Sequence, residues 1–332
     1  MTEATHKENP LNSPRFLPLV LSVVVLLALA ACGSDEPTAT AVPDANDPLN
    51  AGIAAKGYAN PGRLVSAAWV DANQDDSNVV VIDLRKQEDY DAGHIPGAVR
   101  LTPKTVFQGT GADGVPGMLP DSTLIATSLS ELGVTADDTL VFYDGASNLW
   151  SSRAMWALDV YGHDDSRLLD GSWAAWAASG NEAAVEATTL TASTYAFADV
   201  PNEGLIANWE EVLASIEDPS TIVCDTRSPG EYAGQDVRAE SGGHIPEALN
   251  VNWNRAINEA GEFLPAAELA TLYEEEGIQG TGTVITLCQT AVRATHTWFV
   301  LQELLGYPSV QVYDGSWVEW GNRSDLPITT RG

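Results

Sequence analysis

The sequence predicts an α/β fold made of two tandem domains, each an open parallel sheet with helices on both faces. Three observations support this prediction. The chain has 332 residues, which is enough for two domains. Three short motifs occur twice, in the same order and at a nearly constant spacing. Short β-branched runs alternate with longer amphipathic segments, as in parallel sheets that are covered by helices.

The repeated motifs become visible when the sequence is compared with itself. Residues 80–85 match residues 222–227, which lie 142 positions further along the chain. Residues 93–96 match 243–246 at a spacing of 150, and residues 170–173 match 314–317 at a spacing of 144. A tandem duplication explains this spacing. The longer middle interval predicts an insertion in the second copy, at residues 234–241.

Within the second copy, residues 221–224 and 283–287 are predicted strands, and 209–216 and 294–305 are predicted helices. The second helix has Gly306 as its stop signal and Pro308 just beyond. Ligands of such sheets bind at the carboxyl ends of the strands. We therefore expect the functional site after the strand 283–287.

The N-terminal segment has the pattern of an export signal. Lys7 and Arg15 precede an uncharged run, residues 16–31, which is short for a membrane-spanning helix. Small residues then precede Cys32, and this ending resembles a bacterial lipoprotein signal, in which the Cys is lipidated. The resemblance implies an exported protein, lipid-anchored to the cell envelope at the outer face of the cell membrane or in the periplasm. A plain signal peptide and an uncleaved anchor remain as alternatives.

The expected domain boundaries follow from these patterns. They are 1–31 for the lipoprotein signal peptide, 32–54 for a flexible tether, 55–185 for the N-terminal domain, 186–203 for a linker and 204–332 for the C-terminal domain.

The chain is strongly acidic. It has 46 Asp and Glu against 16 Lys and Arg, a formal charge of −30. Phosphate binding depends on clustered Lys and Arg, so we expect no nucleic-acid partner. Hydrophobic residues at 44% and charged residues at 19% exclude collagen-like, coiled-coil and fully disordered chains. We interpret the acidity as a solubility adaptation and expect a monomer.

Two cysteines remain after Cys32, namely Cys224 and Cys288. A disulfide framework usually has more, and the sequence leaves open whether these two are paired or free. Cys224 falls in a predicted buried strand and is expected to be inert.

Cys288 follows the strand 283–287 and starts a loop that leads into the next helix. Loop N–H groups and the start of a helix both stabilise a thiolate, and Arg293 adds a positive charge. Cys288 is therefore a candidate nucleophile. A buried, unreactive cysteine is the alternative.

The first copy provides an internal control. At a spacing of 144, Cys288 corresponds to Asp144 and Arg293 to Leu149. Gly162 and Gly306 match at the same spacing, so we expect loops of equal length. The first copy lacks the nucleophile and the cation, and we expect it to be inactive.

Together these motifs, with the ending Asp-Gly-Ser-Trp-Val-Glu-Trp at 314–320, resemble the tandem-domain rhodaneses, which include thiosulfate and 3-mercaptopyruvate sulfurtransferases. The resemblance covers about residues 55–325, and residues 293–306 are similar to actinobacterial members. It implies that Cys288 takes a sulfur from a small anionic donor as a persulfide and passes it to a thiol or cyanide. Neither a cofactor nor a metal is implied.

The resemblance also implies the site residues. The six-residue loop would form the pocket floor and bind the substrate through Gln289, Thr290, Ala291, Val292 and Arg293, while Asp225, Arg227 and His244 would play supporting roles.

The loop departs from the family pattern at two positions. Gln289 stands where thiosulfate-preferring loops often carry a cation, and Ala291 stands where Gly is common, a residue used where φ is positive. Mercaptopyruvate-preferring loops often lack an Arg at the sixth place, so Arg293 favours thiosulfate.

Three alternatives to a thiosulfate sulfurtransferase remain. One is a 3-mercaptopyruvate sulfurtransferase, and another is a membrane-tethered sulfur-binding or docking module without turnover. The third, a related phosphatase or arsenate reductase, is disfavoured because those loops place five residues between Cys and Arg, whereas four separate Cys288 from Arg293.

Overall fold

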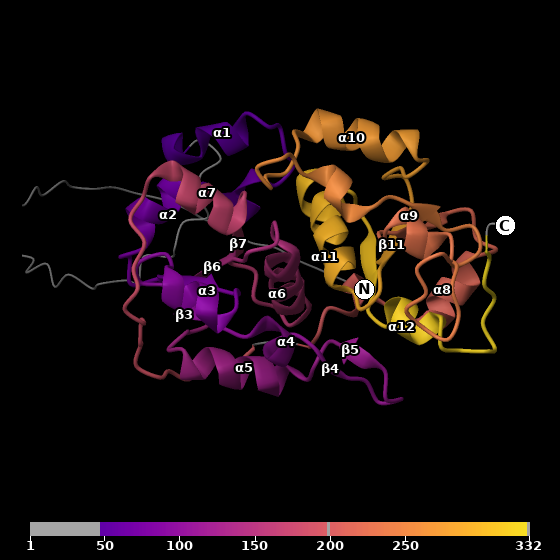
Figure 1. Cartoon of the computed structure of the whole chain (residues 1–332), viewed down its shortest axis with the longest axis horizontal. Coiled ribbons are helices and arrows are strands. Elements are labelled where there is room, and N and C mark those ends of the chain that lie inside the picture. The colour runs from indigo at the N-terminus through magenta and orange to yellow at the C-terminus, as the bar shows by residue number, and fades with distance from the viewer. Residues whose placement is uncertain (1–46, 198–199, 331–332) are drawn as a thin grey trace, which may run out of the picture. The chain divides into compact units, whose positions relative to one another are not determined.

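The computed structural model describes residues 47–197 and 200–330 (Figure 1). The predicted signal peptide, Cys32 and most of the predicted tether lie outside the described residues. None of the helices within the described ranges has the length and apolar character needed to cross a membrane.

Two five-stranded parallel sheets form the framework, and their strands follow the same order, β1-β7-β6-β2-β3 and β8-β12-β11-β9-β10. The first sheet contains β1 (Leu64–Val65), β2 (Val79–Asp83), β3 (Val99–Arg100), β6 (Thr139–Tyr143) and β7 (Ser166–Leu169). The second contains β8 (Ile206–Ala207), β9 (Thr221–Asp225), β10 (Leu249–Asn250), β11 (Thr283–Leu287) and β12 (Val310–Tyr313). The predicted α/β fold with two tandem parallel-sheet domains is confirmed.

Helices and one antiparallel hairpin complete the described structure. The hairpin is β4 (Gly109–Thr110) with β5 (Pro116–Met118). In the first copy the helices are α1 (Ala51–Ala54), α2 (Ala67–Asn73), α3 (Gln87–Ala92), α4 (Pro103–Val106), α5 (Ser122–Glu131), α6 (Leu149–Val160) and α7 (Ser172–Ser179). In the second they are α8 (Trp209–Ser215), α9 (Pro229–Tyr232), α10 (Ala266–Glu275), α11 (Val292–Phe299), which continues into a π-helical turn (Val300–Leu304), and α12 (Ser316–Trp320).

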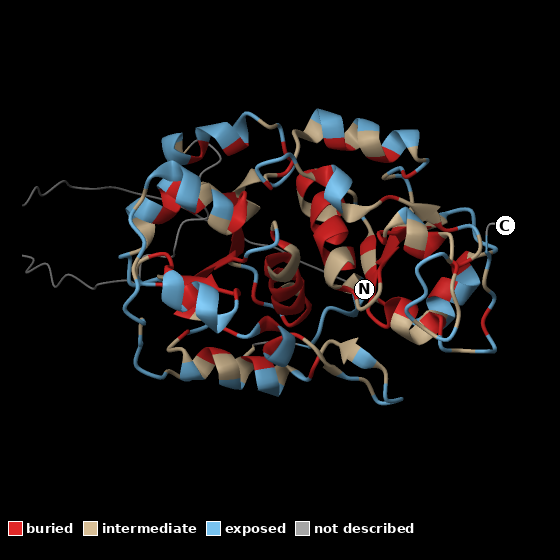
Figure 2. Ribbon diagram, viewed as in Figure 1, coloured by how far each residue is buried: buried red, intermediate tan, exposed pale blue. Residues whose placement is uncertain are grey.

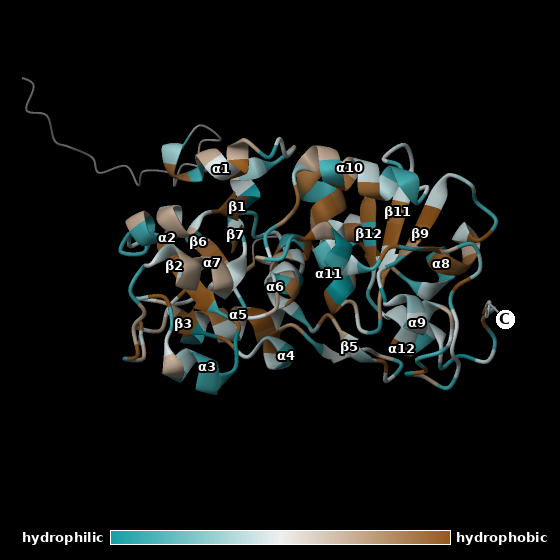
Figure 3. Ribbon diagram, turned by 45° about the horizontal axis from the view of Figure 1, so that its top comes forward, coloured by the Kyte–Doolittle hydropathy of each residue, from teal (hydrophilic) through white to brown (hydrophobic). Residues whose placement is uncertain are grey.

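Helices cover both faces of each sheet, which explains why the strands are apolar along most of their length (Figure 3). In the second sheet, Val223, Ile285 and Leu287 face α8, α9 and α12. Cys224, Val284 and Val312 face the opposite side, toward α10 and α11.

One hydrophobic core runs through both copies. Helices α6 and α11 contact each other and lie side by side between the sheets (Figure 1), and both are largely buried (Figure 2). Trp156 on α6 and Trp298 on α11 belong to this shared cluster and are almost fully enclosed. Side chains of this size each remove roughly 150–250 Å² from water. The two sheets are therefore joined by packing as well as by the chain.

The repeated Asp-Gly-Ser-Trp motif makes polar contacts that cross between the copies. Asp314 of the second copy accepts hydrogen bonds from the Leu119 N–H (2.5 Å) and from Arg153 (2.6 Å) of the first. Asp170 of the first copy accepts one from the Phe263 N–H (3.0 Å) of the second. The same motif position in each copy thus binds backbone of the other.

The predicted tether extends too far toward the first domain. Residues 48–54 form a short 3-10 helix followed by α1, and the side chain of Ile53 is buried. Ile53 packs into the shared hydrophobic cluster, so the last part of the range 32–54 belongs to the folded structure.

Candidate active site

Cys288 directly follows β11, the middle strand of the second sheet, and so lies at the predicted carboxyl end. Its side chain is 1% exposed. The Ser316 hydroxyl accepts hydrogen bonds from the N–H groups of Cys288 and Ala291 (both 3.2 Å), and the Trp317 N–H donates to the Cys288 carbonyl (2.9 Å). The start of α12 therefore holds the cysteine loop in place.

The two loops are not equal in length, so that prediction was wrong. Four residues lead from Asp144 to the left-handed residue Asn148 before α6, but only three lead from Cys288 to Ala291 before α11. The first helical hydrogen bonds support this alignment of Asn148 with Ala291: the Ser152 N–H donates to the Asn148 carbonyl, and the Thr295 N–H donates to the Ala291 carbonyl. The π-helical turn at the end of α11 takes up the extra residue, which restores the match at the terminal glycine.

The loop of the first copy binds the carboxylate of Asp144 through backbone N–H groups. Its carboxylate accepts four backbone hydrogen bonds, from the N–H groups of Ala146 (2.8 Å), Asn148 (3.0 Å), Trp150 (2.8 Å) and Ser151 (3.1 Å). The last two are the second and third residues of α6. The loop and helix start therefore form a backbone site for negative charge.

In the second copy the corresponding loop is one residue shorter and starts with Cys288. The second and third residues of α11 are Arg293 and Ala294, so Arg293 corresponds to Trp150 rather than Leu149. Among the described residues, neither of their amides has an acceptor. They correspond to the two amides of α6 that donate to the Asp144 carboxylate in the first copy.

Arg293 is tied to a buried carboxylate that the sequence did not indicate. Its two terminal nitrogens donate to the two oxygens of Glu231 (2.7 and 2.9 Å), and Glu231 is 1% exposed. Burial opposes the charge of Arg293, but hydrogen bonding to Glu231 and the nearby Cys288 outweigh it and raise the pKa of Arg293. Burial also opposes the charge of Glu231, yet Arg293 lowers the pKa of Glu231 to about 2. The positive charge beside Cys288 is thus partly offset.

The other predicted loop residues contact segments from elsewhere in the chain. The Gln289 side chain donates to the carbonyl of Arg238 (3.1 Å), in the predicted insertion 234–241. The Thr290 carbonyl accepts from Gln108 (3.2 Å) of the first copy. Ala291 has a φ of +60°, the left-handed conformation expected for the Gly that it replaces. Val292 is the first residue of α11.

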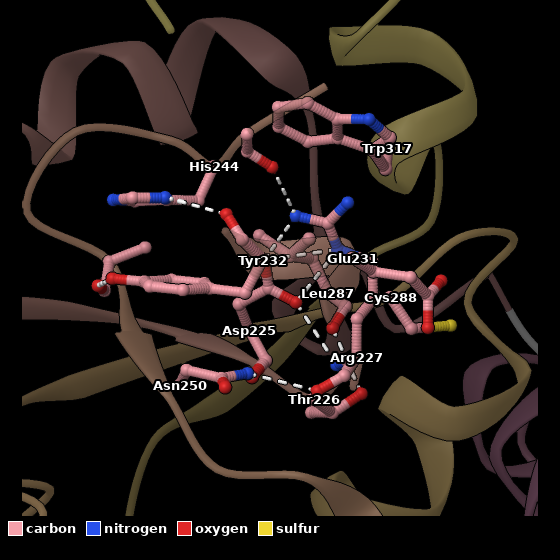
Figure 4. A network of polar contacts seen from close by, with 12 residues as sticks. Asp225, Thr226, Arg227, Glu231, Tyr232, His244, Asn250, Leu287, Cys288 and Trp317 are labelled. Atoms are coloured by element: carbon pink, nitrogen blue, oxygen red, sulfur yellow. Dashed lines mark hydrogen bonds and ion pairs between the residues drawn. The ribbon is translucent and has the colours of Figure 1, made fainter. Parts of the chain in front are cut away.

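The predicted supporting residues form a network beside the loop (Figure 4). The Asp225 carboxylate accepts hydrogen bonds from the Arg227 backbone and guanidinium (2.6 to 3.1 Å), and Arg227 also donates to the Gly243 carbonyl (2.8 Å). The guanidinium lies 4.2 Å from the Trp317 ring centre. His244 stacks on Tyr232 with ring centres 3.7 Å apart.

The first copy repeats this network around Asp83, Arg85, Trp173 and His94. An arrangement that both copies keep, with and without the cysteine, serves the geometry of the strand ends and the turn.

Sequence reasoning missed Glu231, Ser316, Gln108 and Arg238. The spacing of Ser228 and Glu231 is that of a capping box, and the structure has one there. That local signal predicts a helix start, but not the contact with Arg293, which lies 62 positions further along the chain.

Both remaining cysteines are free. Cys224 is fully buried, and burial raises the pKa of its thiol. Within the described ranges, no group of three or more His, Cys, Asp and Glu is placed to hold a metal ion.

Comparison with known proteins places this geometry in a family. The rhodanese-like domain family matches residues 66–179 and 208–323. A thiosulfate sulfurtransferase of Corynebacterium glutamicum is 35% identical over 286 residues, covering 82% of this chain and 92% of that protein. A sulfur carrier protein of Thermus thermophilus is 37% identical over 288 residues, covering 82% of this chain and 98% of that protein.

Among solved structures, the fold is similar to that of the anaerobic ergothioneine biosynthesis enzyme from Chlorobium limicola in complex with trimethyl histidine. The TM-score is 0.74 at 22% identity, covering 83% of this chain and 72% of the other. The family model matches two domains of this chain, and the two relatives are 35% and 37% identical to it along nearly their whole length. These matches show the family. The chain belongs to the rhodanese-family sulfurtransferases with two tandem domains.

Proposed function

We propose that the protein transfers a sulfane sulfur from thiosulfate to a thiophilic acceptor, cyanide or a thiol, through a persulfide on Cys288. The observation that carries this proposal is the pair of loops that follow the corresponding strands β6 and β11 of the two copies. In the first copy the backbone holds the Asp144 carboxylate, and in the second the same strand end and helix start surround Cys288. A loop that stabilises a carboxylate can also stabilise a thiolate and the charged persulfide that replaces it.

The proposed reaction has two displacement steps. The Cys288 thiolate attacks the outer sulfur of thiosulfate, a new S–S bond forms, and the old S–S bond breaks with its electron pair leaving on sulfite. The acceptor then attacks the outer persulfide sulfur, and the electron pair of that S–S bond returns to Cys288 as thiolate. Cyanide becomes thiocyanate, and a thiolate becomes a persulfide. After both steps Cys288 is again a thiolate, so the enzyme is neither oxidised nor reduced over the cycle and no further co-reactant is needed.

The experiment measures thiocyanate formation from thiosulfate and cyanide, together with the mass of the protein after donor treatment. We expect turnover and one added sulfur atom on Cys288. Cys288→Ser should lose both, whereas Cys224→Ser, at the other free and buried cysteine, should keep both. A protein that gains no sulfur from thiosulfate would refute the proposal.

The donor is tested by comparing thiosulfate with 3-mercaptopyruvate. The name of the Corynebacterium relative supports thiosulfate. The pairing of Arg293 with Glu231 reduces the local positive charge that an inorganic dianion would use, so the expected preference rests on that name and not on this charge. A kcat/KM at least tenfold higher for thiosulfate is expected, and the reverse preference would assign the mercaptopyruvate activity.

A sulfur carrier without rapid turnover is the second candidate, because the Thermus relative is named a sulfur carrier protein. It predicts that the Cys288 persulfide forms at the same rate but is released slowly to cyanide and quickly to a protein thiol. Single-turnover release to cyanide and to a reduced thiol-carrying protein separates the two roles.

We also propose export and lipidation at Cys32, on the strength of the apolar run 16–31 and the small residues before Cys32. Metabolic labelling with a fatty-acid analogue should mark the wild-type protein in the membrane fraction. Cys32→Ala should remain unlabelled, and labelling of that variant would overturn this part of the proposal.

A further inference from the structure

Nearly all cations in the described part of this acidic chain are ion-paired. Ten of its thirteen Lys and Arg residues lie within 4.0 Å of a carboxylate oxygen. The other three, Lys86, Arg100 and Lys104, have no carboxylate partner among the described residues. Because the chain has 46 acidic residues and only 16 basic ones, most cations are expected to have a carboxylate partner. Three unpaired cations in one place are therefore unusual.

These three cations line a single cavity. It has a volume of about 550 Å³ and lies at the carboxyl ends of the strands of the first sheet, beside Asp144. Lys86 and Lys104 are exposed, and Arg100 is half-buried. The Arg100 Nε donates to the Arg85 carbonyl (3.0 Å), which fixes the guanidinium at the wall. Its terminal nitrogens have no acceptor within residues 47–197 and 200–330. Arg85 is a fourth cation in the lining.

The negative charges around this cavity do not cancel the three cations. Asp144 is almost fully buried, and its carboxylate is already held by four backbone N–H groups. Arg85 is paired with Asp83 beneath it. Asp89 is an exposed carboxylate in the lining, and it forms no ion pair with any described cation. The cavity therefore keeps an excess of positive charge in a chain that is otherwise strongly negative.

The walls also supply apolar surface. Leu84, Pro103 and the half-buried Trp150 line the cavity together with the cations. A concave site of a few hundred Å³ with apolar walls and a few convergent charges is typical of small-molecule sites. A flat basic patch would suit a macromolecule, but a concave, solvent-open hollow of this size suits a metabolite.

We propose that the cavity of the first, cysteine-free copy binds a small organic anion that carries two or more negatively charged oxygens, as phosphate or carboxylate groups. Lys86, Arg100 and Lys104 hold these oxygens, and Trp150 with Pro103 contacts the apolar part. The first copy then has a ligand site of its own at the position that corresponds to the sulfur-transfer site of the second. This site does not depend on the sulfurtransferase activity.

The test uses isothermal titration calorimetry on the whole protein with citrate and with pyrophosphate as probes, and with thiosulfate as a third. Citrate or pyrophosphate should bind with saturable heat and one site per chain. Cys288→Ser should bind them as the wild type does, which separates this site from the sulfur-transfer site. Binding of thiosulfate alone, lost in Cys288→Ser, would overturn the proposal.

Two variants locate the site. Lys86→Gln with Lys104→Gln removes two exposed cations and should weaken binding at least tenfold, because charged hydrogen bonds to the probe are lost. Arg238→Gln with Arg323→Gln removes two cations from the second copy and should change the affinity less than twofold. Equal weakening in both double variants, or no saturable heat with citrate and pyrophosphate, would refute the assignment. Unfolding midpoints confirm that each variant is folded.

Discussion

Both oxygens of the Glu231 carboxylate bind the guanidinium of Arg293, which lies five residues after Cys288. Glu231 is part of the short helix α9, and its fixed position follows from the capping box that it forms with Ser228. The loop is thereby anchored to the helix that follows β9. This contact fixes the position of the sixth loop residue relative to α9.

Breaking this pair should destabilise the fold. Arg293→Leu leaves the Glu231 carboxylate buried without its main partner, and we expect a loss of about 3 kcal/mol, the lower end for buried pairs. The double variant with Glu231→Gln should recover part of the loss, because no unpaired charge remains. Urea unfolding measures both. Arg255→Leu is the control, since it breaks an exposed pair with Glu276 and should cost under about 1 kcal/mol.

The same pair predicts a specific acid sensitivity. The folded pKa of Glu231 is about 2, below its ordinary value of 4.5, so the folded state favours the ionised form. The resulting stability is fully present above about pH 4.5 and is lost as the pH falls toward 2. Glu231→Gln should therefore show a shallower decline of unfolding free energy over this range. A wild type and variant with parallel declines would contradict the assignment.

The hairpin of the first copy should influence activity through Thr290. Gly117 has a φ of +86°, and a side-chain carbon added there would lie 3.1 Å from the Thr290 Cβ. Gly114 has a φ of +81° with no atom within 4 Å of such a carbon. Both Gly→Ala variants carry the same backbone strain, but only Gly117→Ala presses on the cysteine loop.

We expect Gly117→Ala to lower kcat/KM for sulfur transfer about tenfold, because small displacements of reacting groups are costly. Gly114→Ala should keep the wild-type value. Steady-state thiocyanate formation compares the two. Equal activities would mean that the hairpin does not position the loop.

Asp144 should matter for stability and not for turnover. Asp144→Asn removes the charge and replaces one acceptor oxygen with an NH₂ group, so that two of the four backbone N–H groups lose their acceptor. Hydrogen bonds to charged groups contribute about 1.5–3 kcal/mol each, and we expect a loss of about 3 kcal/mol in urea unfolding. Activity per folded molecule should stay unchanged.

Asp121→Asn is the matched control for that change. Asp121 caps α5 by accepting the Thr123 N–H (2.8 Å) at an exposed position. Asn caps helices about as well as Asp, so this variant should unfold within about 0.5 kcal/mol of the wild type. If the two variants lose the same stability, Asp144 is no more than an ordinary cap.

The sequence predicted the fold well because its signals are local. The β-branched run at residues 283–287 coincides with β11, and the repeated motifs mark the same strand ends in both sheets. The sequence did not reveal that the cysteine loop is one residue shorter than the loop of the first copy. The π-helical turn at the end of α11 contains one extra residue, so Gly306 still matches Gly162 at a spacing of 144. Glu231 escaped because its contact with Arg293 depends on the pairing of β9 with β11. Burial of Ile53 likewise depends on a distant core.

His296 should make the protein sensitive to mild acid. It is fully buried on α11, next to the rings of Phe263 (5.0 Å) and Trp253 (5.1 Å), and burial lowers the pKa of His296 to about 3. Its folded pKa lies below the ordinary 6.5, so stability is fully present above pH 6.5 and is lost as the pH falls toward 3. Each pH unit in that range costs about 1.4 kcal/mol. From pH 7.5 to 5, wild type should lose about 2 kcal/mol more than His296→Phe in urea unfolding, whereas a constant difference between them would show that burial does not lower the pKa of His296.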